Sequence, residues 1–268
     1  LRASVIQNLR KKHSFKLFCV GDDWQSIYRF TGGEIGIMVF ESEFEKYFGK
    51  RKIVDLEYTY RFGSRLCEAA TNFILTNEKG QLKKAVKSIK TDNRPPIEIF
   101  LQDGVDNDFS VRKHVIKKLD ELFEIHKNDE KPIKILFLSR FKTNTYFNFY
   151  DDLRQLVMRI FANKKFVVET MDYIRFSTVH KAKGVECDYV FLMNINNTRL
   201  GFPCNIDDDE ILKLIINHID AFPYEEERRT FYVALTRTKN RVFVYATKGD
   251  EISSFINEIS GDQFKENY

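Results

Sequence analysis

Ten consecutive residues, Gly21–Phe30, carry several groups that could do chemistry. Asp22 and Asp23 supply two carboxylates, and Gln25 supplies an amide that can hold a water or a phosphate oxygen. Aromatic side chains alternate through the same segment. The polar groups suit a phosphate site, while aromatic rings can stack on bases. A polar loop flanked by core aromatics is the competing interpretation of this segment alone.

Three later segments carry similar groups, and each lies beside an expected strand: Tyr58–Phe62, Ser177–Glu186 and Glu225–Thr238. Open parallel sheets bind ligands at strand ends, where segments that are far apart in sequence meet. An Arg beside a terminal phosphate stabilises the charge that develops during phosphoryl transfer. For Ser177–Glu186 alone, a structural loop with solvated lysines is the alternative.

Strands alternating with helices must position these segments. We expect strands at Leu17–Val20, Lys52–Glu57, Ile97–Leu101, Ile133–Ser139, Phe166–Val168, Ile174–Ser177, Tyr189–Asn194 and Arg241–Ala246. We expect helices at Val5–Lys12, Met38–Phe48, Arg65–Leu75, Asp106–His126, Phe147–Phe161 and Glu225–Thr238, and an exposed linker at Glu78–Pro96. This alternation predicts an α/β fold with a mostly parallel sheet and helices on both faces.

Composition narrows the class of protein. The 268 residues include 43 basic and 39 acidic side chains, so the net charge of +4 says less than local clusters such as Lys83–Lys90. The four cysteines form no Cys-x-x-Cys pair, which argues against a zinc knuckle or a disulfide framework. We expect a cytoplasmic protein without a membrane segment, since no apolar run approaches the roughly 20 residues that span a bilayer.

Together the four segments resemble motifs of the UvrD/Rep-like helicases of superfamily 1, and most closely those of its helicase IV-like members. Val20–Phe30 is similar to the family's third motif, Leu56–Arg61 to its fourth, Phe176–Glu186 to its fifth and Glu225–Thr238 to its sixth, in the same order. The resemblance implies a RecA-like fold of the P-loop NTPase type.

The resemblance also implies an ATP site. Gln25 would sense the γ-phosphate and help to place the attacking water. Arg61 would reach the same phosphate, and Arg237 would be the arginine finger, so these three are the expected catalytic residues. Tyr60 would stack near the adenine. The full set of expected ATP-binding residues is Asp23, Gln25, Tyr60, Arg61, Gly184, Glu186 and Arg237.

A second set of residues is implied to contact single-stranded DNA. Tyr28 and Phe30 would stack on the strand. Thr178, His180 and Lys183 would touch the DNA or couple it to the nucleotide. In the sixth motif, salt-bridged scaffolding is the expected role of Glu227, Arg228 and Arg229. We expect no metal ligands within this chain.

The sequence departs from the family pattern at several positions. Trp24 stands where the family usually has a third acidic residue, a substitution typical of helicase IV-like members. Thr59 and Phe62 replace the Asn and Ser that usually flank the Tyr-Arg pair. Between Arg140 and Thr178 there is too little chain for the large inserted subdomain of UvrD and Rep.

The chain has no Gly-x-x-x-x-Gly-Lys-Ser/Thr loop and no acidic Walker B segment. We therefore expect it not to hydrolyse ATP alone, and expect ATP and Mg²⁺ to bind the intact protein rather than this chain tightly. The simplest account is a C-terminal part of a longer helicase. Residues 1–50 would complete the first RecA-like lobe, which is otherwise missing. Residues 51–268 would form the second lobe, a UvrD-like helicase C-terminal domain.

The expected function is thus the C-terminal motor part of an ATP-dependent DNA helicase or translocase, with single-stranded DNA and the missing lobe as partners. Two alternatives remain open. One is an ATP-driven remodeller of helicase IV type that associates with RNA polymerase. The other is a nucleic-acid-binding module without catalysis.

Overall fold

The structure is a computed structural model that describes residues 2–29, 36–92, 94–102, 107–142, 152, 154–155, 157–159, 165–206, 210, 224–248, 252–259 and 264–267. Within these residues, six parallel strands form one sheet in the order β5-β4-β6-β7-β3-β8. In chain order the strands are β3 (Ile97–Gln102), β4 (Ile135–Ser139), β5 (Ile174–Thr178), β6 (Cys187–Leu192), β7 (Thr238–Thr247) and β8 (Phe264–Asn267).

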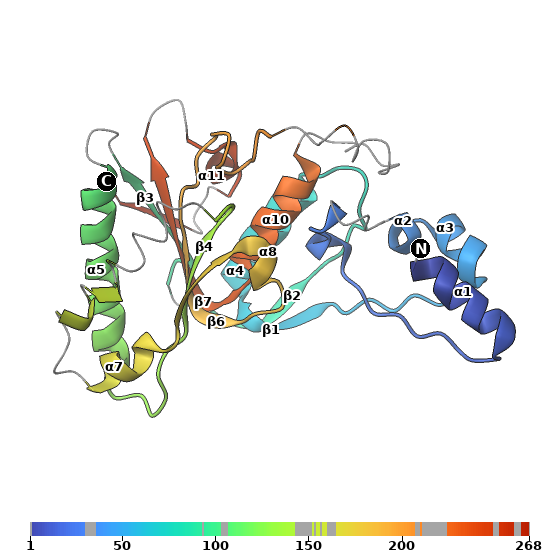
Figure 1. Ribbon diagram of the computed structural model, residues 1–268, viewed down its shortest axis with the longest axis horizontal. Helices are drawn as coiled ribbons and strands as arrows, with labels where there is room; N and C mark the ends of the chain where they lie inside the picture. Colours follow the sequence, from blue (N-terminus) through green and yellow to red (C-terminus); the bar gives the residue numbers. More distant parts are fainter. Residues whose placement is uncertain are drawn as a thin grey trace.

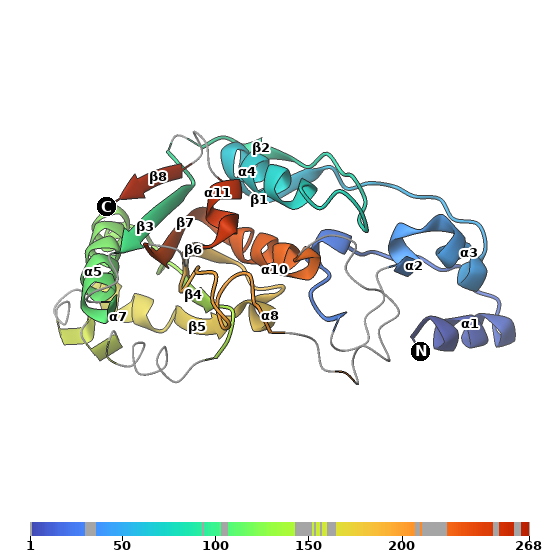
Figure 2. The same ribbon diagram turned by 90° about the horizontal axis from the view of Figure 1, so that it is seen from above.

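Helices cover both faces of this sheet, as Figure 1 and Figure 2 show from two directions. On one face lie α5 (Asn107–His126) and α7 (Lys165–Met171). On the other face lie α4 (Ser64–Leu75), α8 (Val179–Ala182), α10 (Glu225–Leu235) and α11 (Ser254–Glu258).

The alternation of buried side chains along β6 shows why two layers of helices are needed. Val190 and Leu192 join the apolar cluster under α10, while Tyr189 and Phe191 join the cluster under α5. Successive residues of a strand point to opposite faces, so a strand that is apolar throughout must be covered on both sides. The predicted α/β class, a mostly parallel sheet with helices on both faces, is confirmed.

A second, smaller sheet pairs β1 (Tyr58–Gly63) with β2 (Lys87–Lys90) in parallel. The prediction of an exposed linker over Glu78–Pro96 was therefore wrong at β2. This strand has a lysine at each end, and charged residues of this kind are more typical of an exposed segment, so the sequence did not indicate a strand. Ser88 lies between them and ties it to β1, because its hydroxyl donates to the carbonyl oxygen of Phe62 at 2.6 Å.

Two predicted strands are absent from the part of the chain that the structure describes. Leu17–Val20 and Lys52–Glu57 have no strand pairing, and Phe18 and Leu56 are 90% and 81% exposed. Both segments have strand-like sequences, but a strand is stable only where a neighbour completes its hydrogen bonds. The Lys87 amide donates to the carbonyl oxygen of Glu57 at 2.7 Å, directly before β1 begins, but the earlier residues of Lys52–Glu57 and all of Leu17–Val20 have no strand neighbour among the described residues.

Three further expectations differ from the structure. Phe166–Val168 lies in the helix α7 rather than in a strand, because a short apolar run fits either element. The helix expected at Met38–Phe48 divides into α2 (Gly36–Val39) and α3 (Glu41–Phe48), and α3 has no buried residue. The helix α10 ends at Leu235, since β7 begins three residues later. The expected helix Phe147–Phe161 lies largely outside the described residues.

The first helices stand away from the sheet (Figure 1). There α1 (Arg2–Lys12) contacts the end of α3, where Arg10 Nη1 donates to the carbonyl oxygen of Phe48 at 2.8 Å. Among the described residues, no helix combines the length and apolar character needed to cross a membrane.

Candidate functional site

The site is organised by α10, which packs against the short 3-10 turn η1 (Asp23–Gln25) and against α8 and α4. Trp24 is 1% exposed, and its ring meets the edge of Tyr232 on α10 with the centroids 5.6 Å apart. Arg229 Nε on α10 donates to the carbonyl oxygen of Ser26 at 3.0 Å. One helix therefore fixes the position of the segment that carries Gln25.

Just beyond the C-terminal end of α10, Arg237 is only 1% exposed. Its Nε donates to the carbonyl oxygen of Val233 at 2.9 Å, and its Nη2 donates to Thr236 Oγ1 at 3.2 Å. In the described part of the chain no carboxylate forms an ion pair with it. Burial, together with the nearby charge of Arg61, lowers the pKa of Arg237 to about 10. The structure thus holds a buried cationic group whose described hydrogen-bond partners are neutral oxygens, and Glu186 acts on it only as a nearby charge.

Arg61 reaches the same place from β1. Its Nη1 donates to the carbonyl oxygen of Thr236 at 3.1 Å, and its Nε donates to Glu186 Oε1 at 2.6 Å. The hydrogen bond from Arg61 lowers the pKa of Glu186. Arg61, Glu186 and Arg237, which are far apart in sequence, thus meet near the start of β6 and β7.

Two other predicted ATP-site residues lie at the edge of this group. Tyr60 on β1 is 67% exposed, so its ring is free to stack on a planar ligand. Gly184 has a φ of +87°, in the turn between α8 and β6. A left-handed φ favours glycine, which allows the chain to turn sharply before Glu186.

Asp23 occupies a different position. It is 1% exposed, and its Oδ2 accepts a hydrogen bond from the Leu82 amide at 2.6 Å, while its Oδ1 pairs with Lys84. Its carboxylate is thus engaged inside the protein. Gln25 is more accessible, and its Nε2 donates to Asp22 Oδ2 at 2.5 Å.

The residues expected to contact DNA gather around α8. The Tyr28 hydroxyl donates to the carbonyl oxygen of His180 at 2.5 Å, and the two rings meet edge to face. The Lys183 ammonium lies 5.1 Å from the centre of the Tyr28 ring. Thr178 caps α8, since its side chain accepts a hydrogen bond from the Lys181 amide. Phe30 lies outside the described residues.

Lys183 connects this group to the arginines. Burial lowers its pKa, and the charge of Arg237 acts in the same direction, while Asp22 acts against both. The segment before Gln25, the loop after α8 and the end of α10 therefore share one electrostatic environment. The structure therefore brings Lys183 of the DNA set close to Arg237 of the ATP set, while Asp23 is engaged elsewhere.

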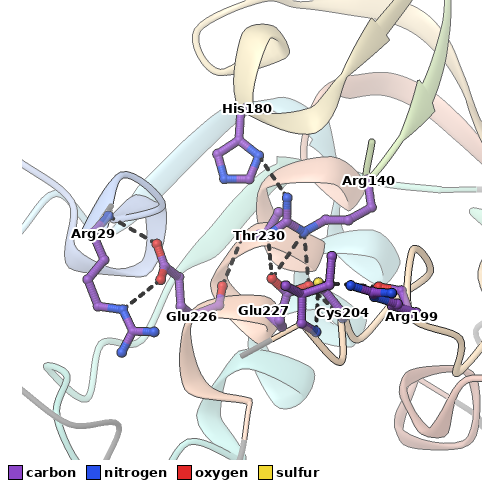
Figure 3. Close-up of polar contacts among 9 residues, drawn as sticks. Arg29, Arg140, His180, Arg199, Cys204, Glu226, Glu227 and Thr230 are labelled. Atoms are coloured by element: carbon purple, nitrogen blue, oxygen red, sulfur yellow. Dashed lines mark hydrogen bonds and ion pairs between the residues drawn. The ribbon is translucent and has the colours of Figure 1, made fainter. Parts of the chain in front are cut away.

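Arg140 is a member of this region that the sequence did not single out (Figure 3). It follows the last residue of β4, and its Nη2 lies 2.7 Å from Glu227 Oε1. Its Nη1 donates to His180 Nδ1 at 3.4 Å. Burial, and then the charge of Arg140, lower the pKa of His180 to about 4, so the imidazole is neutral at pH 7. The signal that could have found Arg140 is its position at a strand end.

The first turn of α10 is held by ion pairs on several sides. Figure 3 shows Arg29 and Arg140 reaching two neighbouring carboxylates of this turn. The pairs are Glu225 with Arg229, Glu226 with Arg29, Glu227 with Arg140, and Arg228 with Glu258. Scaffolding was the predicted role of Glu227, Arg228 and Arg229, and these contacts confirm it.

The described residues contain no group of three or more His, Cys, Asp or Glu side chains that could hold a metal ion. The side chains that could meet a ligand are instead cationic, amide or aromatic. This set suits a phosphorylated ligand, for which Arg and Lys supply the charge and aromatic rings supply stacking surface.

Comparisons with known proteins match this chain to a family of helicases. Residues 150–249 match the model of the UvrD-like helicase C-terminal domain. DNA helicase IV of Escherichia coli is 33% identical over 92% of this chain and 32% of its own length. A probable DNA helicase II homolog of Mycoplasma capricolum is 28% identical over 62% of this chain and 22% of its own length. The ATP-dependent DNA helicase PcrA of Bacillus subtilis is 32% identical over 46% of this chain and 16% of its own length. The chain spans about a third or less of each relative.

Proposed function

We propose that this chain is the C-terminal motor part of an ATP-dependent DNA translocase. The premise is its family: the chain belongs to the UvrD/Rep-like helicases and carries their C-terminal domain. In this proposal it supplies an arginine finger and contacts to single-stranded DNA. The observation that carries the proposal is the environment of Arg237, a buried cation whose partners are neutral oxygens.

A phosphate group would complete this environment. Two guanidinium groups close together repel each other, and burial adds to the cost of charging Arg237. A terminal phosphate beside the two guanidinium groups would add the negative charge that Glu186 alone does not supply to both. An arginine that meets a phosphoryl group in the transition state contributes about 10³-fold or more to the rate.

The remaining residues of the ATP site fit around this centre. Gln25 would orient the attacking water, and Arg61 would exchange its bond to Glu186 for one to the γ-phosphate. Tyr60 offers its exposed ring to the adenine, and Gly184 and Glu186 border the ribose and phosphates. Bound ATP supplies the reactive γ-phosphate. A first lobe would contain the phosphate loop and bind Mg²⁺, since this sequence contains neither a phosphate loop nor a Walker B segment.

Single-stranded DNA would pass over the α8 side of the site. Aromatic stacking on bases is worth about 1–3 kcal/mol per base and does not depend on sequence. Tyr28 and Phe30 would provide it, with Lys183 against the backbone phosphates. His180 and Thr178 hold the loop that carries Lys183, and the bond from Tyr28 to His180 would link the strand to that loop.

The exposed segments before and after α3 support the proposed division into lobes. Residues 1–50 would complete a first RecA-like lobe, and residues 51–268 would form the second lobe without a large inserted subdomain. The apolar side chains of Phe18, Val20 and Leu56 are 74–90% exposed, and a neighbouring sheet would bury them. About 25 cal/mol would be gained for each Å² of apolar surface so covered.

The decisive experiment is steady-state ATP hydrolysis by the full-length protein, with and without single-stranded DNA. We expect DNA to stimulate hydrolysis. Arg237→Ala should lower kcat by about 10³-fold or more and leave nucleotide affinity within about tenfold, because the group acts mainly on the transition state. Arg175→Ala is the control, since Arg175 is an exposed arginine on β5 to which no part in the proposed site is assigned.

Other outcomes would favour other functions. If the rate of ATP hydrolysis is unchanged by DNA but raised by RNA polymerase, a polymerase-associated remodeller would be favoured. No hydrolysis by the wild type under any of these conditions would contradict the proposal and favour a non-catalytic nucleic-acid-binding module.

A further inference from the structure

We infer that Lys84 is a positioning residue for Gln25, acting through Asp22 to fix which end of the Gln25 amide faces the attacking water. This inference rests on the proposed ATPase function. Lys84 lies in the segment between α4 and β2, outside all four motif-like segments. It contributes no group to the ATP site itself, so its role is through the contacts that it makes with η1.

The turn that carries Gln25 is closed by its own backbone and by Asp22. The Gln25 and Ser26 amides donate to the carbonyl oxygens of Asp22 and Asp23 at 3.2 and 3.0 Å. Asp22 Oδ1 also accepts a hydrogen bond from the Trp24 amide at 3.2 Å. A turn of three residues is short, so its conformation depends on these caps.

The segment Leu82–Lys84 clamps this turn from outside. The Leu82 amide donates to Asp23 Oδ2 at 2.6 Å, and the carbonyl oxygen of Leu82 accepts from Trp24 Nε1 at 3.0 Å. Lys84 Nζ lies 2.7 Å from Asp22 Oδ1 and also pairs with Asp23. Its ammonium is 4.7 Å from the centre of the Trp24 ring.

Lys84 is needed because two adjacent carboxylates point toward one place. Asp23 is almost fully buried, and the Lys84 side chain is itself only 20% exposed. A buried carboxylate without a cation is strongly unfavourable, so loss of Lys84 should displace Asp23 or Asp22. Either movement would change the acceptor that Gln25 meets.

The contact between Asp22 and Gln25 fixes the orientation of the amide. An ionised carboxylate only accepts hydrogen bonds, so the side-chain group that faces Asp22 Oδ2 is the Gln25 NH₂. The carbonyl oxygen of the Gln25 amide then points away from Asp22. That oxygen can accept a hydrogen bond from a water, which is what an attacking water needs from the residue that orients it.

The sharpest test is Asp22→Asn in the full-length protein. The Asn oxygen would serve the Lys84 ammonium and the Trp24 amide, so its NH₂ would face Gln25 and turn the Gln25 oxygen inward. We expect kcat to fall by about 100-fold, a typical cost of misplacing a catalytic group, while KM for ATP changes less than about threefold. The melting temperature should change little, since Asp22 is partly exposed.

Lys84→Met tests the same chain of contacts one step further back. We expect a similar fall in kcat, together with a lower melting temperature, because Asp23 loses its cation. Lys84→Arg should restore most of the kcat. Lys83→Met is the matched control, since Lys83 is the exposed neighbour and should leave kcat unchanged.

The results separate this inference from the proposed function. DNA-stimulated hydrolysis by the wild type with unchanged kcat in Asp22→Asn and Lys84→Met overturns the inference alone. A wild type without hydrolysis overturns both. A fall in melting temperature without a fall in kcat would reduce Lys84 to a structural residue and would also overturn the inference.

Discussion

Arginines at the two ends of α10 have different partners. At its first turn, each charged side chain of Glu225–Arg229 has an oppositely charged partner, and Arg229 and Glu225 are 3% and 0% exposed. Beyond its last turn, Arg237 is equally buried but donates only to neutral oxygens. The residue type is the same, but at the first turn each charge has a direct ion pair, while Arg237 has only the more distant charge of Glu186.

This difference separates a structural arginine from one that awaits a ligand. A buried ion pair with good geometry holds its two elements in one arrangement, and removal of either partner leaves an unpaired charge. A buried guanidinium without a counter-charge stabilises little, but it is ready to interact with an anion that arrives. Three predictions test whether this contrast is real.

The largest effect is expected at the paired end. Arg229→Met should lower the free energy of unfolding of this chain by about 3–5 kcal/mol, because the buried carboxylate of Glu225 would lose its cation. Arg237→Met should stay within about 1 kcal/mol of the wild type, since the loss of two hydrogen bonds is offset by the removal of an uncompensated charge. Urea denaturation of both variants measures the difference. Equal losses would remove the contrast between the two ends.

The contrast was only partly visible in the sequence. The spacing of Glu225 and Arg229, four residues apart on a helix, predicts a pair, and scaffolding was expected for this motif. The partners of Glu227 and Asp22 could not be predicted in this way. Arg140 lies 87 residues from Glu227, and Lys84 lies 62 residues from Asp22. Such pairs arise from tertiary packing, which residue spacing does not encode.

The strands show the same limit. The sheet strands β3, β4, β5, β6 and β7 were all predicted, β4 as a strongly apolar run and β7 as an alternating pattern. Leu17–Val20 has an equally strand-like sequence but no neighbour among the described residues, so it forms no strand here. β-structure depends on what lies beside it, and local sequence identifies only its candidates.

A smaller effect is expected from His180, which meets Arg140 near the paired end. Its pKa of about 4 lies below the usual 6.5, so the unfolded chain binds more protons between these values. Stability should therefore be complete above pH 6.5 and fall as the pH drops toward 4, by about 1–2 kcal/mol after allowance for solvent screening. Thermal unfolding of wild type and His180→Gln at pH 7 and 5 measures this term.

Arg140 provides the control for that titration. In Arg140→Gln, the pKa of His180 should rise toward 6.5, because one of its two depressing causes is removed while burial remains. Imidazole resonances followed by NMR across this range report the value directly. An unchanged pKa would mean that the charge of Arg140 does not act on His180, and that Arg140 interacts only with Glu227.

The smallest effect is expected at the unpaired end, where Glu186 is bonded to Arg61. Their side chains are 44% and 25% exposed, and exposed pairs of this kind contribute about 0–1 kcal/mol. Glu186→Gln should therefore change the free energy of unfolding by less than about 0.5 kcal/mol, with no further change in 0.5 M salt. Glu225→Gln, measured in parallel, should cost several times more. A Glu186 pair as strong as the Glu225 pair would mean that Arg61 is held structurally, and it could not then be released to meet a phosphate.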